Sequence, residues 1–137
     1  MKKLFYLLLF NIIIGSTYPQ NQNIDSTILK KAEQLCKNYL LIDTHIDLPD
    51  WLYDGWFDVT QLSKGEIDYP RAIKGGLDVA FMSIYTSPSL EGTSKSKIKA
   101  DSMISLVHKM VRTWPDKFAF IRNISDIKTK KKKNKIL

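Results

Sequence analysis

The sequence predicts an α/β fold with parallel strands. Two apolar runs, 40–42 and 77–85, are typical of strands, and helical patterns precede and follow them. The second run carries apolar side chains on both of its faces, which is typical of a strand covered on both sides in a parallel sheet. Strands that alternate with helices along a chain favour parallel pairing.

The first half of the chain supplies a helix, a strand and a long excursion. A helix is expected over 26–38, because Asp25 and Ser26 are good N-cap residues and apolar residues recur at helical spacing after them. The strand that begins at Leu40 runs into polar residues. Residues 49–69 are expected to be largely irregular, and they carry three aromatic residues: Trp51, Tyr53 and Trp56.

The second half repeats the alternation of strand and helix. A short helix over 69–74, closed by two glycines, leads into the strand 77–85. After a loop over 87–94, apolar residues at helical spacing predict a helix over 98–114, which Pro115 ends. A short apolar run over 118–121 and a helix start at 125–126 follow.

Positive charge lies at the two ends of the chain and not on its body. The formal net charge is +7. Lys2, Lys3 and six lysines within 128–137 are eight of the 21 basic residues, which leaves 13 against 14 acidic ones. A near-neutral body predicts no nucleic-acid partner, because such partners select a basic face.

Residues 1–17 are expected to be an export signal. Two lysines precede an apolar run over 4–14, and the small residues Gly-Ser-Thr follow at 15–17. Because a spanning helix needs about 20 apolar residues, this run predicts cleavage and no stable transmembrane anchor. An uncleaved anchor is the alternative. The expected location is periplasmic or extracellular, and Cys36, the one cysteine, is expected to be a small buried apolar residue.

The first strand ends in two residues suited to a metal ion. In LLIDTHIDLP, residues 40–49, His45 and Asp47 stand two positions apart, so in a strand both side chains lie on one face. An imidazole nitrogen and a carboxylate oxygen so placed can both reach one zinc ion, which binds them at about 2 Å. A polar turn with a solvated histidine before Pro49 is the alternative, and the tripeptide alone leaves both open.

Two blocks of sequence resemble the membrane dipeptidase family, the zinc peptidases also called renal dipeptidases. Residues 41–49, LIDTHIDLP, are similar to the opening strand of that family. Residues 68–85, DYPRAIKGGLDVAFMSIY, are similar to its segment D-x-P-R-x-x-x-G-G-x-x-x-x-F-x-S-x-Y, the second strand. Weaker similarity continues through the next helix, and the resemblance covers about residues 35–127.

This resemblance implies the N-terminal portion of a (β/α)8 TIM barrel of the metal-dependent hydrolase type. It assigns His45 and Asp47 as ligands of one of two zinc ions, and it places a bridging glutamate on the third strand and two histidines later. The implied reaction is the hydrolysis of a dipeptide substrate by a zinc-activated bridging water. It assigns no other catalytic residue and no substrate-binding residue here, and it allows a homodimer in full-length members.

The chain departs from the family in length. A TIM barrel takes about 250 residues, so 137 residues hold about two strands, a truncated barrel domain over 18–127. Glu33, Glu66 and Glu91 lie in the wrong elements for the bridging glutamate, and His108 is expected to be a surface or helix-flank histidine. Two ligands predict weak zinc binding at most, and the isolated chain is expected not to hydrolyse dipeptides.

The lysine-rich segment 128–137 has two interpretations. It begins where a helix of the family continues, which favours a frameshift product, since adenine-rich lysine codons are prone to slippage. The other interpretation is a basic tail for anionic lipid or nucleic acid.

Two further functions compete with the dipeptidase. One is a secreted binding or relic protein that keeps the first barrel strands and binds a partner through the aromatic residues of 51–56. The other is a two-metal hydrolase of the wider amidohydrolase-like group. Those usually carry His-x-His on the first strand, so Asp47 argues against that group.

Overall fold

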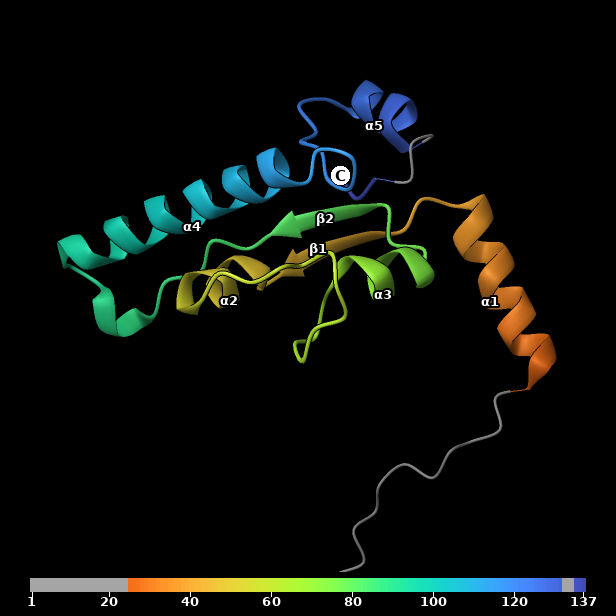
Figure 1. Cartoon of the computed structure of the whole chain (residues 1–137), viewed down its shortest axis with the longest axis horizontal. Coiled ribbons are helices and arrows are strands. Elements are labelled where there is room, and N and C mark those ends of the chain that lie inside the picture. Colours follow the sequence, from red (N-terminus) through yellow and green to blue (C-terminus); the bar gives the residue numbers. More distant parts are fainter. Residues whose placement is uncertain (1–24, 132–134) are drawn as a thin grey trace, which may run out of the picture.

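Two parallel strands run through the centre of the molecule, with helices around them (Figure 1). The structure is a computed structural model that describes residues 25–131 and 135–137. Strand β1 (Ile42–Ile46) pairs with β2 (Val79–Met82), with Ile42 opposite Val79. The parallel pairing and the helices between the strands confirm the predicted α/β class. The export signal expected over 1–17 lies outside the described residues.

The helices follow the predicted order, with one additional helix directly after β1. They are α1 (Ser26–Asn38), α2 (Leu48–Asp54), α3 (Tyr69–Lys74), α4 (Ser94–Thr113) and α5 (Ile124–Lys131), with a short 3-10 turn over Pro88–Leu90. Helix α1 has the predicted bounds because Asp25 accepts a hydrogen bond from the N–H of Thr27 at 2.8 Å and caps it. Helix α3 also has the predicted bounds and ends at the glycine pair 75–76.

Helix α2 corrects the expectation of an irregular segment from residue 49 onward. Pro49 occupies the first turn of α2, where its fixed φ suits a helix and its missing N–H costs nothing. Its side chain and those of Leu48 and Leu52 are buried. The irregular segment is therefore confined to residues 55–68.

The core lies between the strands, α2 and α4. Its buried members include residues from β1, from these helices and from the segment after α4: Ile46, Leu52, Val107, Met110 and Phe118. An ion pair also links the two helices, since Lys99 Nζ of α4 lies 2.6 Å from Asp50 Oδ1 of α2. The hydrogen bond to Asp50 holds the pKa of Lys99 above its ordinary value.

The end of the chain returns to this core. Ile136 and Leu137 are 3% and 7% exposed, and Ile136 forms a parallel bridge with Phe118. Helix α5 continues to Lys131, beyond residue 127, where the sequence predicted the end of the barrel domain. Two residues of the lysine-rich segment 128–137 are thus apolar and buried, which neither interpretation of that segment anticipated.

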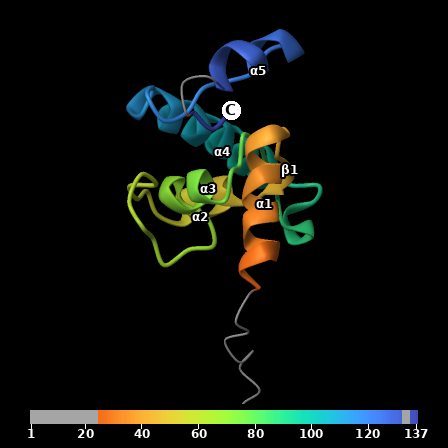
Figure 2. The same ribbon diagram turned by 90° about the vertical axis from the view of Figure 1, so that its right-hand side faces the viewer.

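Helix α1 lies at one end of the molecule, on the right in Figure 1 and toward the viewer in Figure 2. None of its residues is buried, and Ile28, Leu35 and Tyr39 are exposed. Cys36, which the sequence predicted to be buried, is half-buried beside Gly76. Within the described residues, no helix combines the length and the apolar character that crossing a membrane requires.

Candidate metal centre

His45 and Asp47 meet at the carboxyl end of β1. His45 is the last residue but one of β1, and Asp47 directly precedes α2. His45 Nε2 lies 3.3 Å from Asp47 Oδ1, and the side chains are 68% and 55% exposed. The Asp47 side chain makes no hydrogen bond to the first turn of α2. Its carboxylate is therefore turned toward the imidazole and not committed to capping the helix.

The backbone before this pair departs from a regular strand. Three steps along β1, from Asp43 to Ile46, face two steps along β2, from Ala80 to Met82, so β1 carries one extra residue there. Asp43 Oδ1 accepts a hydrogen bond from the N–H of His45 at 2.9 Å within this irregularity. Bulges of this kind re-aim side chains near functional sites. Sequence reasoning assumed strict alternation and did not anticipate this role of Asp43.

The donor atoms fit half of a zinc site. Two ligands of a tetrahedral zinc ion, each bound at about 2.05 Å, lie about 3.3 Å apart. This is the observed separation of His45 Nε2 and Asp47 Oδ1. Within residues 25–131 and 135–137, no cluster of three or more His, Cys, Asp or Glu side chains could hold a metal ion. The pair can thus supply two of the ligands that a closed site needs.

A cavity of about 340 Å³ opens beside the pair. It is lined by charged, aromatic and apolar side chains that include Asp43, His45, Asp47, Trp51, Glu66 and Arg71. Glu66, which sequence reasoning placed in an unrelated element, thus lines the same cavity as His45. Glu66 lies in a loop, and the periodicity of apolar residues does not predict how a loop packs.

Asp68 fixes the loop that forms one wall of this cavity. It is 1% exposed and accepts hydrogen bonds from the N–H groups of Ser63 and Arg71, at 2.9 and 3.0 Å. Arg71 Nε donates to it at 2.8 Å, and Arg71 Nη2 also donates to the carbonyl of Gly65. The Arg71 hydrogen bond lowers the pKa of Asp68 to about 2, against a smaller opposing effect of burial. One carboxylate therefore ties residues 63–65 to the start of α3.

The other candidate residues lie elsewhere. His108 is exposed on α4, where its ring lies 4.6 Å from that of Phe120, and it lines a different cavity. Trp56 stacks on Trp114 at 5.5 Å and packs against the core. Tyr53 is 43% exposed. The aromatic residues of 51–56 are thus mostly engaged within the molecule.

Comparison with known proteins shows the family of this chain. The family model described as membrane dipeptidase, peptidase family M19, matches residues 29–137. The chain belongs to the membrane dipeptidase family. This family consists of zinc-dependent metallopeptidases. The match includes both sequence blocks that carried the resemblance and also the lysine-rich segment.

A solved structure supports the fold of this chain. The chain is similar to the crystal structure of the probable dipeptidase PvdM from Pseudomonas aeruginosa, with a TM-score of 0.68 and 20% identity. The match covers 87% of this chain and 30% of PvdM. The α/β unit therefore corresponds to part of a dipeptidase TIM barrel, as predicted, and spans less than a third of that relative.

Replacing Gly65 with alanine is expected to disturb the cavity wall. A Cβ at Gly65 would lie 2.0 Å from a ring carbon of Trp51, so the indole must move. Overpacking of this kind costs about 1–3 kcal/mol of unfolding free energy. Urea unfolding followed by circular dichroism measures the loss.

Gly55→Ala is the matched control, because a Cβ there meets nothing within 4 Å and the residue lies in the same loop. Equal destabilisation by the two substitutions would show that Trp51 does not pack on Gly65.

Proposed function

We propose that this chain supplies the first metal-binding strand of a zinc dipeptidase, with His45 and Asp47 as ligands of one zinc ion. The observation that carries the proposal is the 3.3 Å approach of His45 Nε2 to Asp47 Oδ1 beside a cavity, in a chain of the dipeptidase family. The position at the carboxyl end of a parallel strand also supports it, since barrel enzymes place their sites there.

A zinc ion bound there would supply a Lewis acid and a water molecule of lowered pKa for peptide hydrolysis. The chain's own residues have three tasks in this proposal. His45 and Asp47 would bind the zinc ion. Asp43 orients the backbone of His45 by accepting a hydrogen bond from its N–H. Arg71, held by Asp68, presents positive charge at the cavity, where it favours a substrate that carries a carboxylate, as a dipeptide does.

The proposed location is outside the cytoplasm, periplasmic or extracellular. The support is the sequence pattern of residues 1–17, a cationic start, a short apolar run and small residues. Edman sequencing of the secreted protein checks this. A mature N-terminus near Tyr18 is expected, and a mature protein that keeps residues 1–17 would contradict it.

A binding protein without catalytic activity is less well supported. That function needs the aromatic residues of 51–56 on the surface, and Trp56 is instead stacked on Trp114, while Trp51 lines the cavity. The family match and the paired donors both favour the metal site.

Zinc titration of the purified chain tests the proposal. Four-ligand sites bind zinc with about 10–16 kcal/mol, so two ligands predict roughly half of this, a Kd between about 1 μM and 0.2 mM. Competition with a chromophoric chelator measures the Kd. His45→Ala and Asp47→Ala should each weaken binding at least tenfold.

His108→Ala is the matched control, because it removes the other histidine of the chain and leaves the pair intact. Its Kd should equal that of the wild type. Unchanged binding in His45→Ala, or lost binding in His108→Ala, would overturn the assignment of the ligands.

The 137-residue chain by itself is expected to show no dipeptidase activity. Two ligands hold a zinc ion weakly, and the described residues offer no third ligand in reach. Hydrolysis of alanyl-alanine in excess zinc, followed by ninhydrin detection, measures this. Activity that is lost in His45→Ala would contradict the expectation.

A further inference from the structure

Lys99 of α4 contacts one side of α2 at two points. Its Nζ lies 2.6 Å from Asp50 Oδ1, and the two side chains are only 17% and 31% exposed. Within the described residues, no other donor reaches this carboxylate oxygen, which is buried from solvent. The same Nζ lies 5.4 Å from the centre of the Tyr53 ring, and Tyr53 follows Asp50 by three positions, on the same face of the helix.

The ion pair reaches the turn that directly follows Asp47. The N–H groups of Asp50 and Trp51 donate to the carbonyl of Asp47, at 3.1 and 3.4 Å. The Asp47 side chain itself makes no hydrogen bond to this turn. The position of its carboxylate therefore depends on the backbone of residue 47, and that backbone is bonded to the first turn of α2.

Apolar contacts alone do not fix how α2 is rotated about its own axis. Leu48 and Leu52 are buried, but the hydrophobic effect that buries them has no direction. An ion pair of 2.6 Å, in contrast, fixes one point of the helix relative to α4. Metal ligands have to be held within about 0.5 Å of their working positions. This ion pair can therefore keep Asp47 Oδ1 at its distance of 3.3 Å from His45 Nε2.

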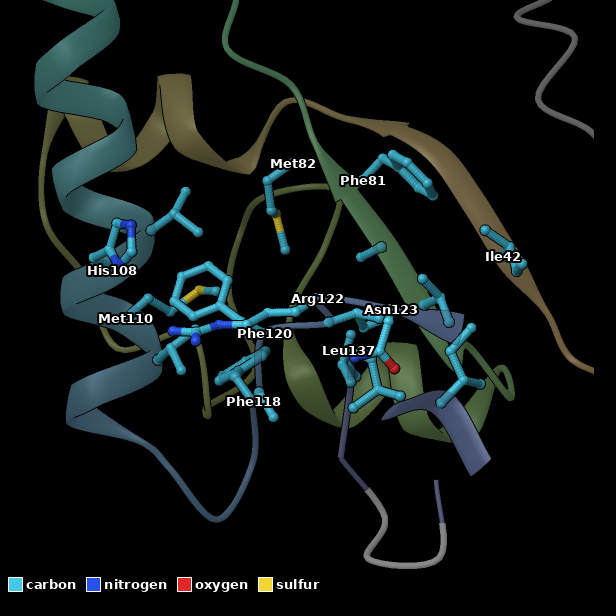
Figure 3. Close-up of a pocket in the computed structure, with 18 of the residues that line it drawn as sticks. Ile42, Phe81, Met82, His108, Met110, Phe118, Phe120, Arg122, Asn123 and Leu137 are labelled. Atoms are coloured by element: carbon cyan, nitrogen blue, oxygen red, sulfur yellow. The ribbon is translucent and has the colours of Figure 1, made fainter. Parts of the chain in front are cut away.

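Helix α4 gives this contact a firm support. Met103 and Met110 of α4 are 0% and 2% exposed. Met110 and Phe118 line the apolar cavity between this helix and β2 (Figure 3). One side of α4 is thus packed into the core, and Lys99 extends from the same helix to α2.

We propose that Lys99 is a positioning residue for the zinc ligand Asp47. Through Asp50 it sets the orientation of the first turn of α2, and so it keeps the Asp47 carboxylate within reach of the ion that His45 binds. Lys99 is not among the side chains that line the cavity beside His45, so it acts through α2 and not by contact. The inference rests on the proposed function, because it takes Asp47 as a ligand.

Zinc titration and hydrogen exchange, both followed by NMR on the full chain, test this role. Lys99→Met removes the charge and keeps an unbranched side chain. It should raise the Kd for zinc, read from the Nε2 resonance of His45, at least fivefold, and speed exchange of the Trp51 amide at least tenfold. The Ala72 amide is the internal reference, because it donates to the carbonyl of Asp68 at the same position of α3. Its exchange should change less than twofold.

Lys97→Met is the matched control variant. It removes the same charge from α4, but Lys97 pairs with Asp101 at the exposed surface, so both readings should stay as in the wild type. Asp50→Asn should reproduce the effect of Lys99→Met, and the double variant should differ less than twofold from either single one, because the two residues act as a pair. Asp50→Asn also carries the test if Lys99→Met does not fold.

Three results would overturn the proposal. The first is a zinc Kd of Lys99→Met within twofold of the wild type. The second is equal acceleration of exchange at Trp51 and Ala72, which would indicate a general loss of stability. The third is a further fivefold loss of binding when Lys99→Met is added to Asp47→Ala, since a residue that acts through Asp47 has nothing to position there.

Failure of the proposed function looks different. In that case His45 does not respond to zinc in the wild type, and both proposals fall together. If Lys99 alone is wrongly assigned, the wild type binds zinc through His45 and Asp47, and Lys99→Met binds it equally well.

Discussion

Asp68→Asn is expected to lower the free energy of unfolding by about 1.5–3 kcal/mol, because it removes the charge-assisted hydrogen bonds between the buried carboxylate and the half-exposed Arg71. The asparagine keeps the size of the side chain but removes its charge. The loss would also release residues 63–65, which the carboxylate ties to α3. Urea unfolding followed by circular dichroism measures the difference.

Asp101→Asn is the control for the loss of one charge. Asp101 lies on the surface of α4 and pairs with Lys97 at 2.5 Å, four residues earlier. Exposed pairs of this kind contribute about 0.3–0.5 kcal/mol. Comparable losses in the two variants would show that the Asp68–Arg71 pair is no more important than a surface pair.

The same carboxylate predicts a dependence of stability on pH. The pKa of Asp68 falls from 3.8 to about 2 in the folded chain, so the folded state favours the ionised form. The resulting stability, about 2 kcal/mol, is fully present above about pH 4 and is lost as the pH falls toward 2. In Asp68→Asn this part of the acid sensitivity should disappear.

Gly76→Ala is expected to lower the free energy of unfolding by about 3 kcal/mol. Its φ of +79° lies in the left-handed region, where a Cβ costs about 1–2 kcal/mol. The added Cβ would also lie 2.7 Å from the Cβ of Cys36, and overpacking adds about 1–3 kcal/mol. The contact joins α1 to the turn before β2, so α1 should loosen first. Thermal unfolding followed by circular dichroism measures the loss.

Gly92→Ala separates the two causes. Gly92 has a φ of +70°, but a Cβ there meets nothing within 4 Å. It should therefore cost only the backbone part, about 1–2 kcal/mol. If the two alanine variants lose the same stability, Cys36 does not pack against Gly76 and α1 is held by other contacts.

Local signals in the sequence were enough for most of the helices. The N-cap at Asp25 and the glycine pair after Lys74 each lie at a helix end, so α1 and α3 have the predicted bounds. Helix α2 was missed, because it has only seven residues and shows too little apolar periodicity in the sequence. The lysine-rich segment misled for another reason, since its charge pattern conceals two apolar residues that tertiary pairing buries.

The candidate site was predictable only along the strand. His45 and Asp47 are close in sequence, so their spacing was enough to suggest that they converge. Glu66 and Trp51 reach the same cavity through a loop, and their positions depend on the buried Asp68. The bulge in β1 depends on pairing with a strand whose residues lie 36 or 37 positions further along the chain. Neither the loop contacts nor the bulge produces a periodic pattern of apolar residues in the sequence.

The central claim is that His45 and Asp47 bind one zinc ion together. The chain has two histidines, so the imidazole nitrogens can be followed individually by ¹⁵N NMR during a zinc titration. The account predicts that the Nε2 resonance of His45 shifts, that His108 does not respond, and that Asp47→Ala reduces the response of His45 at least tenfold at equal zinc. An equal response of both histidines, or a response of His45 that is unchanged in Asp47→Ala, would contradict it.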